Sequence, residues 1–161
     1  MKHILSLFVF FLSITSCIHT DVFEKNVSIP SHQWDRKYQP IFEFDIKDTT
    51  SNYLLFFTIR HTDAYGYSNI WLNAKTFLPG DTLPIETKTE ITLAQYDGKW
   101  LGRGMKMLDV WEHQMPMTKD GIPLHFSRAG TFKLQLQQIM RENPLPQVMS
   151  VGIRLEKVKT N

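Results

Sequence analysis

One cysteine stands out among the residues that could do chemistry. Cys17 is the only cysteine in the 161 residues, and it directly follows Ile14, Thr15 and Ser16. Small side chains before a cysteine let a signal peptidase reach the peptide bond, and a thiol can carry a thioether-linked diacylglycerol. We therefore predict that Cys17 is lipidated and becomes the first residue of the mature chain.

The segment before Cys17 has the pattern of a secretory signal. A basic start at Lys2 and His3 leads into an apolar run over residues 4–14, which is too short to span a bilayer comfortably. The alternatives are an ordinary signal that happens to carry a cysteine and an uncleaved membrane anchor. A single cysteine cannot form an internal disulfide in an exported protein, and lipidation would account for the thiol.

The other residues capable of chemistry do not form a recognisable motif. The histidines after Cys17 stand far apart, with no His-x-x-x-His or Cys-x-x-Cys spacing, at His19, His32, His61, His113 and His125. The glycines do not form a phosphate-binding loop, and no Gly-x-Ser-x-Gly elbow occurs. We predict no metal site and no cofactor.

Two carboxylate pairs could in principle act as general acid and base. They are Asp45 with Asp48, and Asp109 with Glu112. Their separation in space decides whether either pair could work, and such pairs are common in domains of this size. Because no motif requires catalysis, we predict that the protein is not an enzyme.

Aromatic residues give a sharper hypothesis about binding. Six fall in or beside expected loops, and they are Trp34, Tyr65, Tyr67, Trp71, Trp100 and Trp111. If exposed, such side chains could stack on sugar rings or anchor a protein partner. The alternative is that most of them close the two ends of a hydrophobic core.

The elements that must position these residues have the pattern of β-strands. Alternating or β-branched segments separated by turn residues occupy residues 22–27, 41–46, 53–60, 69–77, 85–94, 131–140 and 148–158. The segment 53–60 is continuously apolar, which predicts a central strand buried on both faces. Residues 105–113 fit either a strand or a helical turn.

The pattern as a whole predicts an all-β protein. Short strands at regular spacing indicate an antiparallel β-sandwich, immunoglobulin-like or jelly-roll-like, in a single domain. We predict a signal peptide over 1–16, a lipidated tether over 17–21 and the sandwich over 22–161. The net charge of +2 and the absence of long basic runs argue against nucleic-acid binding.

Two segments resemble a known family. Residues 57–72 (FTIRHTDAYGYSNIWL) and 139–157 (IMRENPLPQVMSVGIRLEK), with the lipidation motif and Val22-Phe23-Glu24, resemble the gliding motility lipoprotein GldH family of the Bacteroidota. The resemblance implies an outer-membrane lipoprotein needed for gliding and linked to the type IX secretion apparatus, with no catalytic activity or cofactor. The tether lacks the acidic run typical of surface-exposed lipoproteins in that phylum, which favours the periplasmic side.

The two segments also suggest a binding surface. We expect their loops to meet at one end of the sandwich, beside the rigid Pro144-Leu145-Pro146 connection. The predicted partner-binding residues are Tyr65, Tyr67, Trp71 and Arg141, and the expected partners are other proteins of the gliding and secretion apparatus. A glycan-binding envelope module that uses exposed aromatic residues is the alternative function.

Overall fold

The computed structural model describes residues 22–105 and 108–158. The predicted signal peptide, the predicted tether and Cys17 lie outside the described residues, so these predictions stay untested. No helix within the described ranges is both long and apolar enough to cross a membrane.

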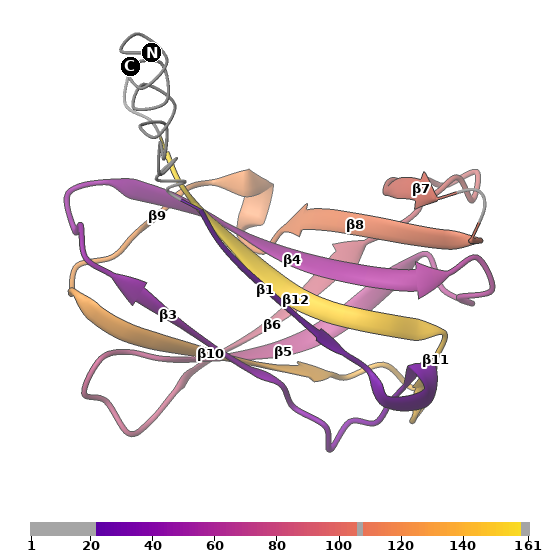
Figure 1. The fold of residues 1–161 in the computed structure, drawn as a ribbon, viewed down its shortest axis with the longest axis horizontal. Helices are drawn as coiled ribbons and strands as arrows, with labels where there is room; N and C mark the ends of the chain where they lie inside the picture. The colour runs from indigo at the N-terminus through magenta and orange to yellow at the C-terminus, as the bar shows by residue number, and fades with distance from the viewer. Residues whose placement is uncertain (1–21, 106–107, 159–161) are drawn as a thin grey trace, which may run out of the picture.

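Two antiparallel sheets pack face to face (Figure 1). The larger sheet runs in the order β1 (Val22–Ser28), β12 (Val148–Lys157), β4 (Asn52–Thr62), β8 (Val110–Pro116) and β7 (Arg103–Met105), with β9 (Leu124–His125) also on β4. The smaller sheet runs in the order β3 (Ile41–Ile46), β10 (Gly130–Gln138), β5 (Asn69–Phe77) and β6 (Ile85–Thr92). A short ribbon joins β2 (Gln33–Trp34) to β11 (Leu145–Pro146), and 3₁₀ turns lie at η2 (Pro30–His32) and η3 (Lys119–Gly121).

The strand order is that of a jelly roll. Among the long strands in chain order, the first pairs with the last (β1 with β12), the second with the next-to-last (β3 with β10), and so inward through β4 with β8 and β5 with β6. This pairing is that of one long hairpin wrapped into two sheets. The predicted antiparallel β-sandwich is confirmed, and the jelly-roll alternative describes its topology.

The strands follow the predicted side-chain alternation. In β3, Phe42, Phe44 and Ile46 are buried while the intervening residues are exposed, as expected for a strand with one wet face. The prediction that β4 is buried on both faces is wrong in part. Its outer-face residue Arg60 is exposed and Phe56 is half-buried, although Thr58 on the same face is buried. The undecided segment 105–113 contributes to strands β7 and β8.

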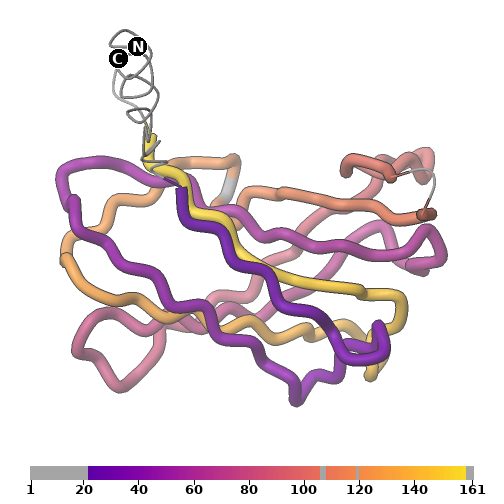
Figure 2. Tube along the Cα trace, viewed as in Figure 1, coloured from indigo at the N-terminus to yellow at the C-terminus, as the bar shows by residue number. Residues whose placement is uncertain are grey.

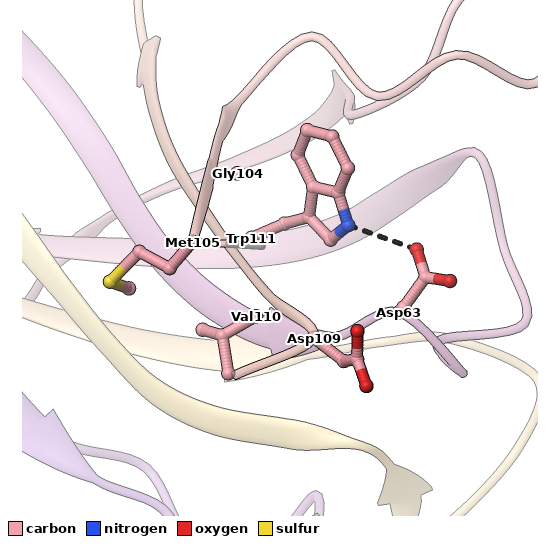
Figure 3. A pocket seen from close by; sticks show the side chains of 6 residues that line it. All are labelled: Asp63, Gly104, Met105, Asp109, Val110 and Trp111. Carbon is pink, nitrogen blue, oxygen red and sulfur yellow. Dashed lines mark hydrogen bonds between the residues drawn. The ribbon is translucent and has the colours of Figure 1, made fainter. Parts of the chain in front are cut away.

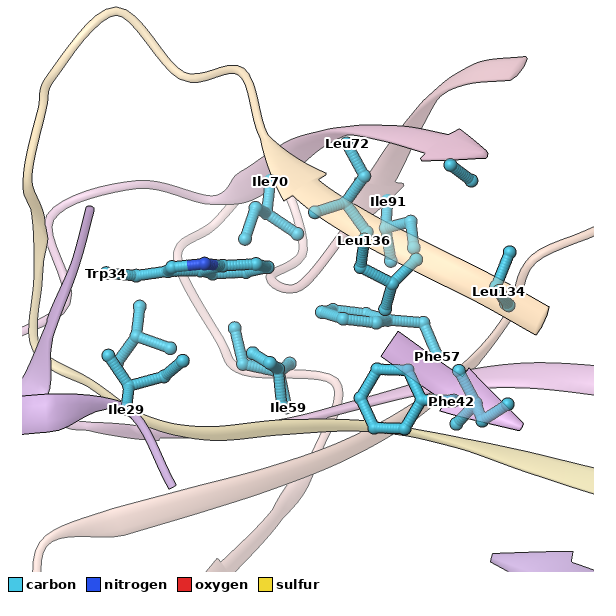
Figure 4. Close-up of a cluster of buried hydrophobic side chains, with 14 of the residues drawn as sticks. Ile29, Trp34, Phe42, Phe57, Ile59, Ile70, Leu72, Ile91, Leu134 and Leu136 are labelled. Atoms are coloured by element: carbon cyan, nitrogen blue, oxygen red, sulfur yellow. The ribbon is translucent and has the colours of Figure 1, made fainter. Parts of the chain in front are cut away.

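The core between the sheets is closed at one end by a tryptophan (Figure 4). Trp34 is 0% exposed and its indole N–H donates to the carbonyl of Tyr38 at 2.9 Å. Ile29, Ile59 and Ile70 lie around the ring in the same cluster. The prediction that Trp34 falls in or beside a loop as an exposed aromatic residue is therefore wrong, because the short β2–β11 ribbon turns it inward.

The sandwich has two distinct ends. Val22 at the start of β1 pairs with Glu156 near the end of β12, so the described chain begins and ends side by side, as Figure 2 shows. We call this the terminal end. The β4–β5 loop (63–68) lies at the opposite, distal end, and the eleven residues of β4 separate the two ends by about 34 Å.

Candidate partner-binding site

Two loops from the segments singled out in the sequence meet at the distal end. Thr62 Oγ1 donates to Gln147 Oε1 at 2.7 Å, and the Thr62 amide donates to the Gln147 carbonyl at 3.1 Å. Further along, the Tyr67 hydroxyl donates to Glu142 Oε2 at 2.7 Å. The β4–β5 loop and the 139–147 segment therefore form one continuous surface, as the sequence predicted.

The 139–147 segment is held from beneath by polar side chains. Asn143 Oδ1 accepts a hydrogen bond from the Arg36 amide at 2.7 Å and another from Gln138 Nε2 at 3.0 Å. Gln138 is 0% exposed, and its Oε1 accepts from the Met140 amide at 2.9 Å. A buried amide that is satisfied at both ends fixes the path of the loop above it.

Three of the predicted contact residues present surface at this end. Trp71 is 41% exposed on the outer face of β5, where its carbonyl accepts from the Ile139 amide at 2.9 Å. Arg141 is exposed and Tyr67 is half-buried. The hydrogen bond to the Glu142 carboxylate raises the pKa of Tyr67, because it stabilises the protonated phenol.

Tyr65 differs from its expected place. It is only 4% exposed, its hydroxyl donates to the Asn69 carbonyl at 3.0 Å, and burial raises its pKa. Its ring packs 5.8 Å from that of Tyr67, centroid to centroid. Tyr65 therefore supports the surface from below and contributes almost no contact area to it.

Beneath Tyr65 lies a pair of buried histidines that sequence analysis missed. His61 and His113 are both 0% exposed, and their Nε2 atoms are 2.9 Å apart. His61 Nδ1 lies 2.8 Å from the Thr62 carbonyl and must donate to it, so His61 Nε2 accepts from His113 Nε2. His113 Nδ1 is then a bare acceptor, buried without a hydrogen-bond partner among the described residues. The two residues are far apart in sequence, so no local pattern could have revealed the pair.

Two tryptophans next to the histidines share one carboxylate as their hydrogen-bond acceptor. Asp63 Oδ1 accepts the indole N–H of Trp100 at 3.1 Å and that of Trp111 at 2.9 Å. Beside this contact lies a hollow of about 210 Å³, lined by Asp63, Gly104, Met105, Asp109, Val110 and Trp111 (Figure 3). The two indoles thus close this end of the core and are not displayed as a flat row.

The carboxylates considered for catalysis do not converge in the described structure. Asp48 pairs with Lys157 at 2.6 Å at the terminal end, and Asp45 accepts from Thr131 at 2.6 Å. Glu112 pairs with Arg60 on the outer face of the larger sheet, whereas Asp109 lines the hollow. Among the described residues no three His, Cys, Asp or Glu side chains are grouped so as to hold a metal ion.

The glycan-binding alternative requires a row of exposed aromatic rings. On the outer face of the smaller sheet the exposed tryptophan is Trp71, and the residues opposite it on neighbouring strands are Glu90 and Ile139. Trp34 is buried, and Trp100 and Trp111 lie in the Asp63 cluster. The described residues therefore offer one indole for stacking on this face.

Comparison with known proteins identifies the family. The profile of the GldH lipoprotein family matches residues 21–155, which includes nearly all of the described sandwich. The chain belongs to the GldH lipoprotein family. The resemblance seen in the sequence is thereby confirmed, together with the assignment as a membrane-associated lipoprotein of the cell envelope.

Two curated relatives align over most of their length. The "Gliding motility lipoprotein GldH homolog" of Christiangramia forsetii is 31% identical over 167 residues, covering 98% of each chain. The "Gliding motility lipoprotein GldH" of Flavobacterium johnsoniae is 26% identical over 149 residues, covering 88% of each chain. Both relatives are named as motility lipoproteins and not as enzymes.

Similarity to solved structures is weak. A carbohydrate-binding module of the CBM28 class, specific for non-crystalline cellulose, gives a TM-score of 0.39 at 10% identity and covers 84% of this chain and 73% of its own. A nora virus structure gives a TM-score of 0.25 at 12% identity, covering 84% of this chain and 54% of its own. These likenesses are too low to support a functional argument.

Proposed function

We propose that this member of the GldH family is a non-enzymatic outer-membrane lipoprotein required for gliding motility and linked to the type IX secretion apparatus. Cys17 carries its lipid, and the sandwich faces the periplasm. Family membership and the named motility relatives support this proposal. The tether between Cys17 and β1 has no acidic run, which supports the periplasmic side.

The observation that carries the proposal is the joined surface at the distal end. The β4–β5 loop and the 139–147 segment are tied together by the Thr62–Gln147 and Tyr67–Glu142 hydrogen bonds. A rigid surface loses little entropy on binding, and tryptophan, tyrosine and arginine are the residue types enriched in interface hot spots. We expect Trp71, Tyr67 and Arg141 to contact a protein of the gliding or secretion apparatus.

The placement of this surface fits such a role. It lies about 34 Å along β4 from the terminal end, where the chain leads back to the predicted lipid. A partner reaching the distal end would therefore not compete with the membrane for the same face. In this arrangement the domain holds its binding surface away from the bilayer.

The test combines crosslinking in cells with a motility assay. The triple variant Tyr67→Ala, Trp71→Ala, Arg141→Ala removes the exposed side chains of Trp71 and Arg141 and the half-buried one of Tyr67, without changing the buried Tyr65. We expect the loss of crosslinks to gliding-apparatus proteins, detected by mass spectrometry, and the loss of gliding in a host that depends on the protein. Circular dichroism and thermal unfolding should show that the fold is kept.

A matched control changes exposed residues away from the surface. Leu83 is 80% exposed and Lys47 is also exposed, both in turns remote from the distal end. The double variant Leu83→Ala, Lys47→Ala should retain crosslinks and gliding. Unchanged crosslinks and motility in a folded triple variant would refute the proposed surface, and recovery of glycans in place of proteins would favour the alternative function.

A further inference from the structure

The connection between β8 and β9 presents an apolar side chain at the terminal end. Ile122 is 60% exposed, and its neighbour Pro123 and Pro116 at the end of β8 are exposed as well. Exposed isoleucine is unfavourable in water, and a single one is not unusual on a protein surface. Ile122 matters because it lies at the end of the sandwich that leads back to the predicted lipid.

Ile122 is held outward by a loop fastened on both sides. Before it, the Met117 amide donates to the Leu55 carbonyl at 2.9 Å. After it, Leu124 pairs with Tyr53 in the β4–β9 ladder. The Gly121 amide closes the turn onto the Thr118 carbonyl at 3.1 Å. With both flanks tied to the start of β4, the loop holds the Ile122 side chain in solvent.

The sheet register places this loop close to the first described residue. Val22 lies opposite Glu156, Glu156 lies opposite Leu54, and Tyr53 lies opposite Leu124. These pairs cross the larger sheet from β1 to β9, with a step of one residue along β4 from Leu54 to Tyr53. Because neighbouring strands are about 4.8 Å apart, β9 lies about 15 Å from the start of β1.

The length of the tether limits how far the domain can stand from the bilayer. Cys17 precedes Val22 by five residues. Even a fully extended chain of that length spans at most about 18 Å. If the acyl chains of Cys17 lie in the membrane, the start of β1 is within this distance of the lipid surface, and the Ile122 loop is at the same end of the sheet.

We propose that the Ile122 loop is a second membrane-contact site, where Ile122 and Pro123 enter the boundary between lipid headgroups and acyl chains. A side chain held outward on an anchored domain needs to penetrate only the outer part of that boundary. The exposed Asp120 carboxylate next to it remains among the headgroups. The contact would hold the distal end of the sandwich away from the membrane. This inference rests on the proposed lipidation of Cys17.

The test uses the fact that lipidation consumes the single native thiol. In the full lipidated chain, Ile122→Cys introduces one free thiol that can be labelled with the fluorophore NBD. Tyr96→Cys is the matched control, because Tyr96 is fully exposed in a hairpin whose base bonds to Ser68 at the distal end. Both proteins are reconstituted into phosphatidylethanolamine–phosphatidylglycerol vesicles, with or without a nitroxide-labelled phospholipid.

We expect NBD at residue 122 to shift its emission to shorter wavelength and to lose fluorescence with nitroxide lipid, while NBD at residue 96 does neither. Equal behaviour at the two positions, with both proteins floating with the vesicles, would overturn the contact and leave the lipid anchor standing. Failure of both proteins to float, with no lipid in the intact mass, would overturn the Cys17 anchor and the contact together. Circular dichroism matching the parent protein establishes that each labelled variant is folded.

Discussion

The buried histidine pair makes the stability of the protein sensitive to mild acid. Each ring nitrogen that could take up a proton is enclosed. A proton on His61 Nε2 would face the N–H of His113, and a proton on His113 Nδ1 would have no acceptor among the described residues. Burial therefore lowers the pKa of both, that of His113 to about 4, and His61 adds to the shift of His113.

The sign and size of the effect follow from linkage. The unfolded chain takes up a proton on His113 near pH 6.5, whereas the folded chain does so only near pH 4. The contribution of His113 to the unfolding free energy is therefore fully present well above pH 6.5 and is lost as the pH drops toward 4. Between pH 7 and pH 5 this one group should remove about 2 kcal/mol of unfolding free energy.

The perturbation that tests this reasoning is His113→Gln. A glutamine amide can still donate to His61 Nε2 but does not titrate. Urea unfolding followed by tryptophan fluorescence at pH 7 and pH 5 gives the two free energies. We expect the acid-induced loss in the variant to be smaller than in the parent by about 2 kcal/mol. The part due to His61 should remain.

The control is His125→Gln, which changes an exposed histidine in β9. It should unfold with the pH dependence of the parent protein. An identical pH dependence in the parent and in His113→Gln would refute the reasoning, because it would mean that His113 takes up its proton equally in the folded and unfolded states.

Three further predictions concern packing. Gly152→Ala would place a Cβ in steric conflict with Asn26 Oδ1 and with the Lys25 carbonyl oxygen of β1, and should cost about 1–3 kcal/mol or more. The control Gly66→Ala, whose Cβ would have nothing within 4 Å, should change the melting temperature little. Trp34→Ala should cost about 3–5 kcal/mol in urea unfolding because the ring is fully buried, and a loss below 1 kcal/mol would contradict its place in the core. Asp63→Ala should cost about 1–2 kcal/mol and alter tryptophan emission, since two indole N–H groups lose their acceptor, while Asp63→Asn should retain most of the stability.

Local pattern predicted the strands well because each strand carries its own signal. The alternation in 41–46 follows from one buried and one wet face, and it became β3. The turn at Gly80, where φ is +83°, and the turn at Gly98, where φ is +85°, follow from residue types that tolerate these angles. The undecided segment 105–113 lacked such a signal, since its β7 strand is only three residues long.

The aromatic residues show where local reasoning fails. Trp34 and Tyr65 stand among polar neighbours in the sequence, yet both are buried. Their burial depends on contacts with residues distant in the chain, such as the β2–β11 pairing of Trp34 with Leu145. Trp71 differs from them, because it stands between Ile70 and Leu72 in β5, and the alternation that buries these two neighbours leaves Trp71 on the outer face, 41% exposed.

The sequence by itself determined the strand pattern, the candidate lipid-bearing cysteine and the family, because each depends on residues close together in the chain or on overall similarity. The tertiary structure alone decided the jelly-roll pairing, the His61–His113 contact and the placement of the Ile122 loop at the same end of the larger sheet as Val22. Each of these joins segments far apart in sequence, and their contacts form only when the whole hairpin of strands closes around one core. The distal surface lies between the two cases. Its residues were predicted, but only the Tyr67–Glu142 and Thr62–Gln147 hydrogen bonds established that the two loops meet.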